Sequence, residues 1–374
     1  MEPTHTYERW NDLPIRALLL SVPASEDVPM FCNFIREALP REGVNTLVVR
    51  FRYQYQFKCH PELADRGALS EADVKQIVLA CREAGIALVP KMNLLGHQSE
   101  ELELMPLLAH YPQFDESPHL NPPDPWVSPG QFDFYCKSLC PLHPDVYPIL
   151  FALMDELIEV CEADSFHAGM DEAWIIGDDH CPRCAGRDKA ELFAYITTRL
   201  HNHLAEKGRR MWIWSDRLID GKTTNLLGWQ ASMNGTHRAI DLIPQDIIIC
   251  DWKYEDAPPT PAYFAVKGFD VLASSCYNPE AAIGQLEQIY LIRKNAKRAF
   301  FSTTLSSRMK GVFATSWIDA KAFIDAYYEP DSGLHTDLAI NTTRTFKELF
   351  AEIRVNGDPI DQKAPNNCPG CDLQ

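Results

Sequence analysis

The sequence predicts a (β/α)8 TIM barrel, because eight short β-rich runs alternate with amphipathic helical segments over most of its 374 residues. Several runs are almost continuously apolar, as in Ile247-Ile248-Ile249, which is typical of parallel strands buried on both faces. The alternative is a doubly wound open sheet, but no glycine-rich phosphate loop follows the first strand. A long proline-rich loop after the third strand and a C-terminal tail complete the expected architecture.

The strands and helices can be placed in order along the chain. Ser70 is placed to cap a helix that Gly85 ends, and Asp188 to cap a helix that Gly208 ends. Pro279 opens a further helix. The eight expected strands are Ile15–Ser21, Val44–Arg52, Ile86–Met92, Ser165–Met170, Met211–Ser215, Asp246–Trp252, Asp270–Ser275 and Gly311–Ser316.

This order of elements divides the chain into three parts. We expect an N-terminal arm over residues 1–14, the barrel over 15–330, and a C-terminal helix and tail over 331–374 packed on or near the barrel. About 70 residues separate the third and fourth strands, and ten of the 27 prolines lie between Pro106 and Pro148. Such a loop is either functional, lying over the C-terminal face where barrels form their active sites, or a rigid structural excursion.

The composition excludes several classes of protein. There are 52 acidic and 35 basic residues, and the resulting net charge of −17 argues against nucleic acid as a partner. No apolar run is long enough to span a membrane. The first 14 residues contain no signal-like apolar segment, so together with the scattered thiols they predict a cytoplasmic setting. The acidic surface and exposed loops are compatible with a homodimer.

Two of the cysteine pairs are spaced as Cys-x-x-Cys. These are Cys181-Pro-Arg-Cys184 and Cys368-Pro-Gly-Cys371, out of twelve cysteines in total. Together they could form a structural zinc site of four cysteines that fixes the tail. A disulfide or redox role and unlinked thiols are the alternatives. We expect neither a catalytic metal nor a cofactor.

The dipeptide Asp-Glu occurs three times, and only Asp171-Glu172 ends a predicted strand. Asp115-Glu116 lies in the proline-rich loop, and Asp155-Glu156 on a helix. The C-terminal ends of barrel strands carry catalytic groups, so Asp171 and Glu172 are the candidate acid–base pair. Adjacent residues of a regular strand point to opposite faces, but Gly169 permits a bend that directs both into one pocket. The alternative is a pair that caps a helix.

Aromatic residues follow other predicted strands. Trp214, Trp252 and Trp317 lie at or near three strand ends, and flat aromatic walls beside carboxylates suit the apolar faces and hydroxyl rim of a pyranose. The alternative is that these side chains fill the barrel core, which is our interpretation of Trp212. His97 follows the third strand, either as a structural histidine or as part of the site.

The motif His167-Ala168-Gly169-Met170-Asp171-Glu172 resembles the His-x-Gly-x-Asp-Glu motif of family 20 glycoside hydrolases, the β-N-acetylhexosaminidases. The segment Lys91–His97 is similar to the third-strand segment of that family, which ends in Gly-His. Trp214-Ser215-Asp216 and Ser316-Trp317-Ile318-Asp319 resemble its fifth- and eighth-strand motifs. The chain departs from the family pattern at Met170, where a second glycine is usual.

The resemblance implies a retaining exo-β-N-acetylhexosaminidase that acts on a glycan containing N-acetylhexosamine. In that family the substrate's own 2-acetamido oxygen attacks the anomeric carbon. By resemblance Glu172 is the general acid and then the base, and Asp171 orients the acetamide and stabilises the oxazolinium. The remaining implied substrate-site residues are Arg16 and Asp319 toward the sugar hydroxyls, His167 behind the pair, His97, the walls Trp214, Trp252 and Trp317, and Tyr277 as donor to the acetamide carbonyl.

Two other functions remain open from the sequence. One is a non-catalytic carbohydrate-binding barrel, although binding alone does not need both Asp171 and Glu172. The other is a glycosidase with a protein nucleophile such as Asp216 or Asp319, which would cleave glycosides that lack the N-acetyl group.

Overall fold

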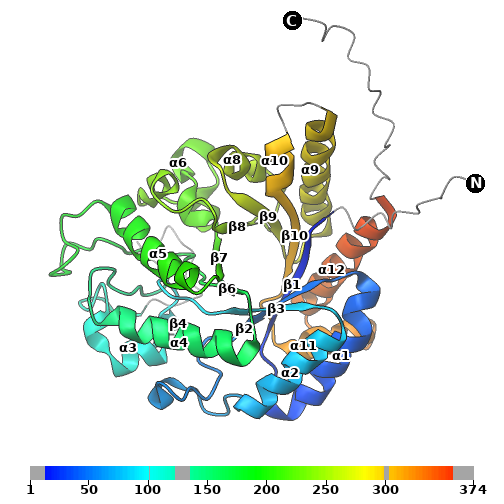
Figure 1. Cartoon of the computed structure of the whole chain (residues 1–374), viewed down its shortest axis with the longest axis horizontal. Helices are drawn as coiled ribbons and strands as arrows, with labels where there is room; N and C mark the ends of the chain where they lie inside the picture. The colour runs from blue at the N-terminus through cyan, green and yellow to red at the C-terminus, as the bar shows by residue number, and fades with distance from the viewer. Residues whose placement is uncertain (1–12, 101, 123–134, 299–302, 357–374) are drawn as a thin grey trace, which may run out of the picture.

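The structure, a computed structural model, describes residues 13–100, 102–122, 135–298 and 303–356. Eight parallel strands form a closed barrel in the order β1-β10-β9-β8-β7-β6-β3-β2, and helices surround it (Figure 1). The (β/α)8 prediction is confirmed, and the open doubly wound sheet is wrong because β1 pairs with both β2 and β10. The barrel strands are β1 (Ile15–Ser21), β2 (Thr46–Arg50), β3 (Ala87–Lys91), β6 (Ser165–His167), β7 (Arg210–Trp214), β8 (Ile248–Trp252), β9 (Asp270–Ser275) and β10 (Met309–Thr315).

The helices begin and end where local chemistry favours it. Ser70 forms a capping box with Asp73 at the start of α2, and Asp188 accepts two backbone N–H groups at the start of α5. The helices are α1 (Val28–Glu42), α2 (Glu71–Glu83), α3 (Pro106–His110), α4 (Val146–Cys161), α5 (Lys189–Glu206), α6 (Gly221–Thr224), α7 (Leu227–Gln230), α8 (Thr260–Lys267), α9 (Pro279–Arg298), α10 (Thr303–Arg308), α11 (Ala320–Tyr328) and α12 (Asp337–Asn356). The short 3-10 helices are η2 (Ser25–Asp27), η3 (Pro61–Leu63), η4 (Pro112–Phe114), η5 (Asp216–Leu218) and η6 (Thr236–Asp241).

The buried apolar side chains form two layers. One lies between the strands and the surrounding helices, and the other fills the inside of the barrel. In the inner layer the ring of Trp214 stacks on Phe313, with centroids 5.3 Å apart and planes 7° from parallel. Trp212 belongs to the same layer, as expected for a side chain that fills the core. The inside of the barrel is therefore packed, and a pocket can form only at one end of it.

The described parts of the long connection between β3 and β6 are folded rather than extended. They contain the hairpin of β4 (Ser99–Glu100) and β5 (Glu103–Leu104), followed by α3, η4 and α4. An isolated bridge pairs Asp115 with Leu139, so the two halves of the connection return to each other. We call the stretch from residue 92 to residue 145 the β3–α4 excursion.

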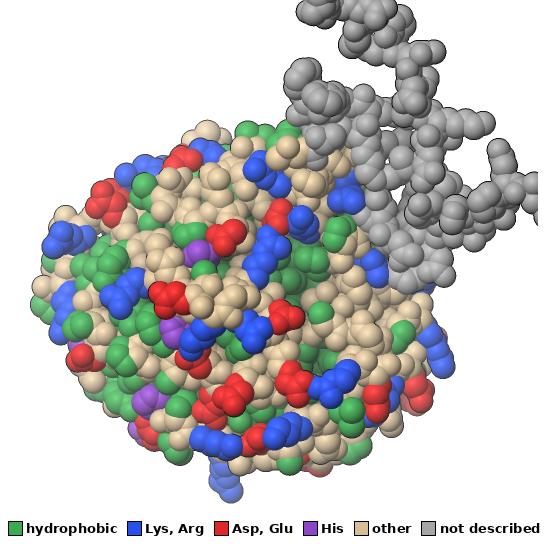
Figure 2. All heavy atoms as spheres, viewed as in Figure 1, with side chains coloured by type: hydrophobic (Ala, Val, Ile, Leu, Met, Phe, Trp, Pro, Cys, Tyr) green, Lys and Arg blue, Asp and Glu red, His purple; other side chains and the backbone are tan. Residues whose placement is uncertain are grey.

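The outer surface carries charges of both signs. Figure 2 shows acidic and basic side chains interspersed over the face that Figure 1 presents. Within the described part of the chain, no helix combines the length and the apolar character that crossing a membrane requires. At the C-terminal end, α12 packs against α9 and α11. Most of the expected N-terminal arm, and the pair Cys368 and Cys371, lie outside the described residues.

Candidate active site

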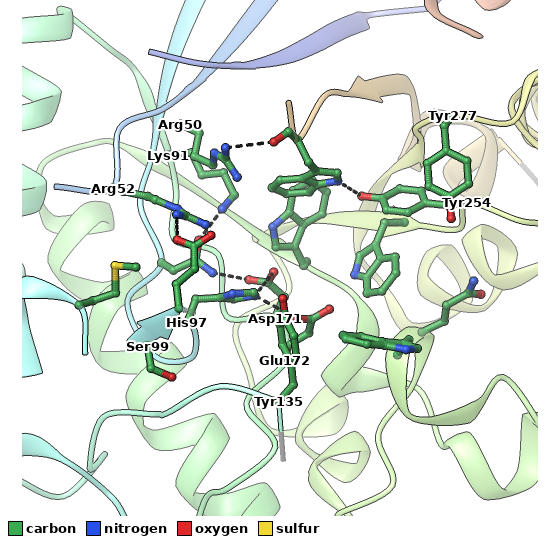
Figure 3. A pocket seen from close by; sticks show the side chains of 18 of the residues that line it. Arg50, Arg52, Lys91, His97, Ser99, Tyr135, Asp171, Glu172, Tyr254 and Tyr277 are labelled. Carbon is green, nitrogen blue, oxygen red and sulfur yellow. Dashed lines mark hydrogen bonds and ion pairs between the residues drawn. The ribbon is translucent and has the colours of Figure 1, made fainter. Parts of the chain in front are cut away.

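The Asp171-Glu172 pair lies on a sharp turn directly after β6. Gly169, Met170 and Glu172 have φ angles of +71°, +73° and +51°, all in the left-handed region. This conformation breaks the alternation of the strand, so both adjacent side chains line the same pocket (Figure 3). The helix-capping alternative is wrong, because α5 begins at Lys189 and Asp188 is its cap.

The turn is pressed against the segment that follows β3. A Cβ on Gly96 would lie 2.5 Å from the backbone oxygen of Asp171, and a Cβ on Gly169 would lie 2.8 Å from the side chain of Asn93. These distances are shorter than a carbon atom allows. Both glycines therefore serve a close approach of two backbones, and the family's usual glycine at position 170 fits the left-handed φ of Met170.

His97 lies between the two carboxylates. Its Nε2 is 3.1 Å from Asp171 Oδ2 and 3.2 Å from Glu172 Oε2 (Figure 3). Burial alone would lower the pKa of His97, but these two partners outweigh burial and raise that pKa to about 9. The raised pKa favours the protonated, cationic form of His97 at neutral pH. His97 also lines the pocket, which favours a place in the site over a purely structural role.

Asp171 is surrounded by groups that favour its charge. Asn93 Nδ2 donates to Asp171 Oδ1 at 2.8 Å, and Lys91 donates to the carbonyl oxygen of the Asn93 side chain. Burial opposes ionisation, yet His97 and Lys91 together hold the pKa of Asp171 well below its ordinary value. Burial lowers the pKa of Lys91 itself to about 8. Asp171 is the carboxylate of the pair that stays ionised.

Glu172 is perturbed in the opposite direction. Burial raises its pKa, opposed by His97 and reinforced by the negative charges of Asp171 and Asp216. The backbone of Glu172 is fixed on both sides: its N–H donates to Asp216 Oδ2 at 3.0 Å, and its carbonyl accepts the thiol of Cys136 at 3.4 Å. Glu172 is thus the member of the pair that retains a proton toward neutral pH.

The pocket has a volume of about 530 Å³, within the range of small-molecule sites. Its walls are aromatic, and Trp317 Nε1 donates to the Tyr254 hydroxyl at 2.8 Å. Tyr254 and Tyr277 lie across the pocket from His97 (Figure 3). The lining residues are Arg50, Arg52, Lys91, Asn93, His97, Ser99, Glu100, Met105, Tyr135, Asp171, Glu172, Trp214, Trp229, Gln230, Trp252, Tyr254, Glu255, Tyr277 and Trp317.

The structure brings together most of the residues that the sequence singled out. Asp171 and Glu172 line the pocket together with five of the other candidates, which are His97, Trp214, Trp252, Tyr277 and Trp317. Trp214 and Trp252 also belong to the inner barrel layer, so these two side chains both line the pocket and fill the core of the barrel. Arg16, Asp319 and His167 are not among the lining residues.

The placement of Arg16 in the substrate site is wrong. Its Nε and Nη1 donate to the carbonyls of Gly43 and Leu13, each at 2.7 Å, and these residues precede β2 and β1. Arg16 is the second residue of β1, so its side chain belongs to the end of the barrel opposite the pocket. The prediction that Asp319 lies in the substrate site is also wrong. Its carboxylate accepts the backbone N–H groups of Lys321 and Ala322 and caps α11.

His167 lies behind the pair and does not reach the pocket. Its ring packs on Trp214 with centroids 4.5 Å apart, and its Nδ1 accepts the N–H of Gly169 at 3.1 Å. Burial lowers the pKa of His167 well below its ordinary value, so the ring is neutral. Direct contact with substrate is therefore excluded for His167, whereas support of the turn fits its position.

Several residues that line the pocket were not predicted from the sequence. Arg50 ends β2, and its Nη2 donates to Ser21 Oγ at 2.6 Å while its guanidinium lies 5.3 Å from the ring of Trp317. Burial lowers the pKa of Arg50 to about 9. The signal that could have found Arg50 is its position near the end of the predicted strand Val44–Arg52. Tyr135 comes from a loop and Trp229 from the short helix α7; their ring centroids are 4.8 Å apart, and no local pattern marks either residue.

A (β/α)8 barrel with two adjacent carboxylates, whose pKa values are shifted in opposite directions, in a pocket with aromatic walls defines the class of protein, a barrel with a glycosidase-type site. A family model described as "Glycosyl hydrolase family 20, catalytic domain" matches residues 52–320. The chain therefore belongs to glycosyl hydrolase family 20, as its motifs indicated.

Individual relatives are distant. A β-hexosaminidase of Emericella nidulans is 22% identical over 222 residues, which are 56% of this chain and 33% of that protein. A β-hexosaminidase of Akkermansia muciniphila is 25% identical over 155 residues, or 40% of this chain and 29% of that protein. The matches thus span about a third of the length of these curated relatives.

Solved structures share the fold over nearly the whole chain. The chitobiase of Flavobacterium johnsoniae superposes with a TM-score of 0.58 at 18% identity, covering 91% of this chain and 51% of that one. A family 20 exo-β-N-acetylglucosaminidase of Vibrio harveyi, in complex with N-acetylglucosamine, has a TM-score of 0.55 at 14% identity, covering 91% and 57%. At these identities the likeness establishes the fold.

Proposed function

We propose that this chain is a retaining exo-β-N-acetylhexosaminidase that uses the 2-acetamido group of its substrate as the nucleophile. The observation that carries the proposal is the pair of adjacent buried carboxylates in one pocket, Asp171 and Glu172, whose pKa values are shifted in opposite directions. Substrate-assisted cleavage needs one ionised carboxylate beside the acetamide and one protonated carboxyl group beside the leaving oxygen. Membership in family 20 and relatives named β-hexosaminidases support the same reaction.

In the first step the acetamide oxygen bonds to the anomeric carbon, and the bond from that carbon to the leaving oxygen breaks. Glu172 gives its proton to the leaving oxygen, while Asp171 accepts the acetamide N–H and stabilises the positive charge of the oxazolinium. In the second step the Glu172 carboxylate takes a proton from water, whose oxygen bonds to the anomeric carbon and restores the acetamide. The product keeps the original anomeric configuration.

The aromatic residues would orient the acetamide. Trp214, Trp252 and Trp317 form the walls. Tyr277 donates its hydroxyl proton to the carboxylate of Glu255. Tyr254 accepts from Trp317 Nε1, and its own proton faces the neutral Thr315 hydroxyl at 3.2 Å, a weaker acceptor than a carboxylate. We therefore prefer Tyr254 to Tyr277 as the hydroxyl that donates to the acetamide carbonyl.

A nucleophile from the protein has no comparable support. Asp216 is fully buried and accepts from the Glu172 N–H, Trp252 Nε1 at 3.2 Å and Arg217 Nε at 2.6 Å. Asp319 is occupied as the cap of α11. Neither carboxylate lines the pocket, so neither is positioned to reach an anomeric carbon bound there.

The test compares an aryl β-N-acetylglucosaminide with the matching aryl β-glucoside, using wild type and Glu172→Gln. We expect turnover of the N-acetyl substrate alone, and a loss of roughly 10²–10⁴-fold in kcat for Glu172→Gln when the leaving group is poor. Glu83→Gln is the matched control, because Glu83 forms an exposed ion pair with Arg36. Equal turnover of both glycosides would refute the substrate-assisted route, and full activity of Glu172→Gln would refute the role of Glu172.

A further inference from the structure

Three cysteines and a glutamate meet in the protein interior, away from the lining of the sugar pocket. A carboxylate oxygen of Glu116 and the sulfurs of Cys140, Cys181 and Cys184 all lie within 4.8 Å of one another. All four residues are buried, at 1% exposure or less. We propose that this cluster, called here the thiolate cluster, is a structural site for a tetrahedral thiolate-preferring cation, with Zn²⁺ as its occupant.

The spacing of the sulfurs fits a shared metal. Cys140 Sγ is 3.5 Å from both Cys181 Sγ and Cys184 Sγ. Two sulfurs bound to one tetrahedral zinc at about 2.3 Å are separated by about 3.8 Å. A disulfide requires about 2.0 Å and would join only two of the three sulfurs. The thiolate cluster therefore has the geometry of a ligand set rather than of a disulfide.

Glu116 lacks a full set of partners. Its Oε1 accepts the backbone N–H groups of Gly177 and Asp178 at 2.7 and 3.1 Å. Among the described residues, its buried Oε2 has no hydrogen-bond partner other than the weakly donating thiols of the thiolate cluster. An unsatisfied buried carboxylate oxygen costs stability, and a cation bound between it and the three sulfurs would remove that cost.

Backbone hydrogen bonds fix the turn that carries two of the ligands. The Cys181 N–H donates to the Asp178 carbonyl and the Arg187 N–H donates to the Cys184 carbonyl, each at 3.0 Å. The Cys-x-x-Cys turn is closed by a bond from the Ala185 N–H to the Cys181 carbonyl at 3.0 Å.

The site joins two segments that are remote in sequence. Glu116 and Cys140 belong to the β3–α4 excursion, where the Glu116 N–H bonds the Ser138 carbonyl at 3.1 Å. Cys181 and Cys184 belong to the loop between β6 and α5, which begins with the catalytic turn. A metal here would tie that loop to the excursion, which also supplies Tyr135 to the pocket. Because the protein would fill all four positions, the site is closed and structural, not catalytic.

This ligand set differs from the one that the two Cys-x-x-Cys motifs suggested. Cys181 and Cys184 are shared by both sets, whereas Cys140 and Glu116 take the places expected for Cys368 and Cys371. The two sets can be separated by experiment. Zinc content is measured in protein purified from zinc-supplemented cells under reducing conditions, for wild type, Cys140→Ser and the double variant Cys368→Ser/Cys371→Ser. Cys59→Ser is the control, because Cys59 is an exposed thiol outside the thiolate cluster.

We expect about one zinc per chain in wild type, the double variant and the control. Zinc binding should weaken by more than about 100-fold in Cys140→Ser. Cobalt substitution of wild type should give the absorption of a tetrahedral thiolate site, which decides the question even where Cys140→Ser fails to fold. The proposal is overturned if reduced wild type takes up neither zinc nor cobalt. It is equally overturned if an intact mass reveals a disulfide in the thiolate cluster, or if the double variant loses zinc while Cys140→Ser retains it.

Discussion

The closest backbone approach in the site makes Gly96 a sensitive position. In Gly96→Ala the new Cβ would lie 2.5 Å from the carbonyl oxygen of Asp171 and 3.3 Å from the carbonyl carbon of Glu172. Real Cβ contacts are essentially never shorter than 3.0 Å, so the catalytic turn must move by at least 0.5 Å. A displacement of 1 Å costs about 10²-fold in rate, so half of it costs about 10-fold. We expect kcat to fall by about 10- to 100-fold, with about 1–3 kcal/mol lost from the free energy of unfolding through overpacking.

The assay is steady-state turnover of an aryl β-N-acetylglucosaminide, read together with thermal unfolding of the same samples. Gly284→Ala is the control, because Gly284 lies within α9 and meets only the Cβ of Ala257, at 3.0 Å. A Gly96→Ala enzyme with wild-type kcat and wild-type Tm would refute the reasoning, since it would mean that the turn tolerates the displacement.

Two further predictions concern charge in the pocket. The active form has Glu172 protonated and Asp171 ionised. Because the pKa of Glu172 is raised, activity should persist above the ordinary pKa of a glutamate and should fall as the pH rises through the raised pKa. Because the pKa of Asp171 is lowered, the fall of activity on the acid side should occur below the ordinary aspartate pKa of about 3.9. A profile of kcat/KM against pH tests both the acid and the basic side. An unchanged basic side in Glu172→Gln would contradict the assignment of Glu172. Arg50→Ala should raise KM by about 10-fold or more, since a sugar hydroxyl bound by this half-buried, pocket-lining guanidinium would lose a charge-assisted hydrogen bond of about 1.5–3 kcal/mol. Wild-type KM in Arg50→Ala would place the sugar away from β2.

The barrel, and the end of it that carries the candidate active site, can be predicted from local patterns in the sequence. Segments with the hydrophobic period of a strand alternate regularly with segments that have the period of a helix. The C-terminal ends of parallel barrel strands lie at the same end of the barrel, so residues that follow different strands converge there. That reasoning is sufficient for His97, Trp214, Trp252 and Trp317, each of which ends or follows a strand. The conformation of the turn was also indicated, since Gly169 has the positive φ that directs Asp171 and Glu172 together.

The errors arose where the end of a strand or a competing hydrogen bond decided the position. Arg16 is near the start of β1 and Arg50 at the end of β2, so only Arg50 reaches the pocket. Asp319 follows β10 closely enough to be a site residue, but the free N–H groups of α11 bind it as a cap. The sequence placed Glu116 in the proline-rich loop without a partner, and the bridge between Asp115 and Leu139 is what brings it beside Cys140. Contacts of this kind depend on tertiary structure and leave no local signal.

The left-handed residues in the catalytic turn cost free energy, and the surrounding structure must compensate for it. Met170 and Glu172 each occupy a conformation about 1–2 kcal/mol less favourable than the usual one. Asp216 holds the turn at the Glu172 N–H, and Asn234 Nδ2 holds the following segment through the carbonyls of Ala173 and Trp174 at 2.9 and 2.8 Å. Cys136 binds the Glu172 carbonyl from the β3–α4 excursion. The proposed zinc site would connect that same excursion to the same loop a short distance further along the chain, so the cation would act on catalysis by keeping a strained turn in place.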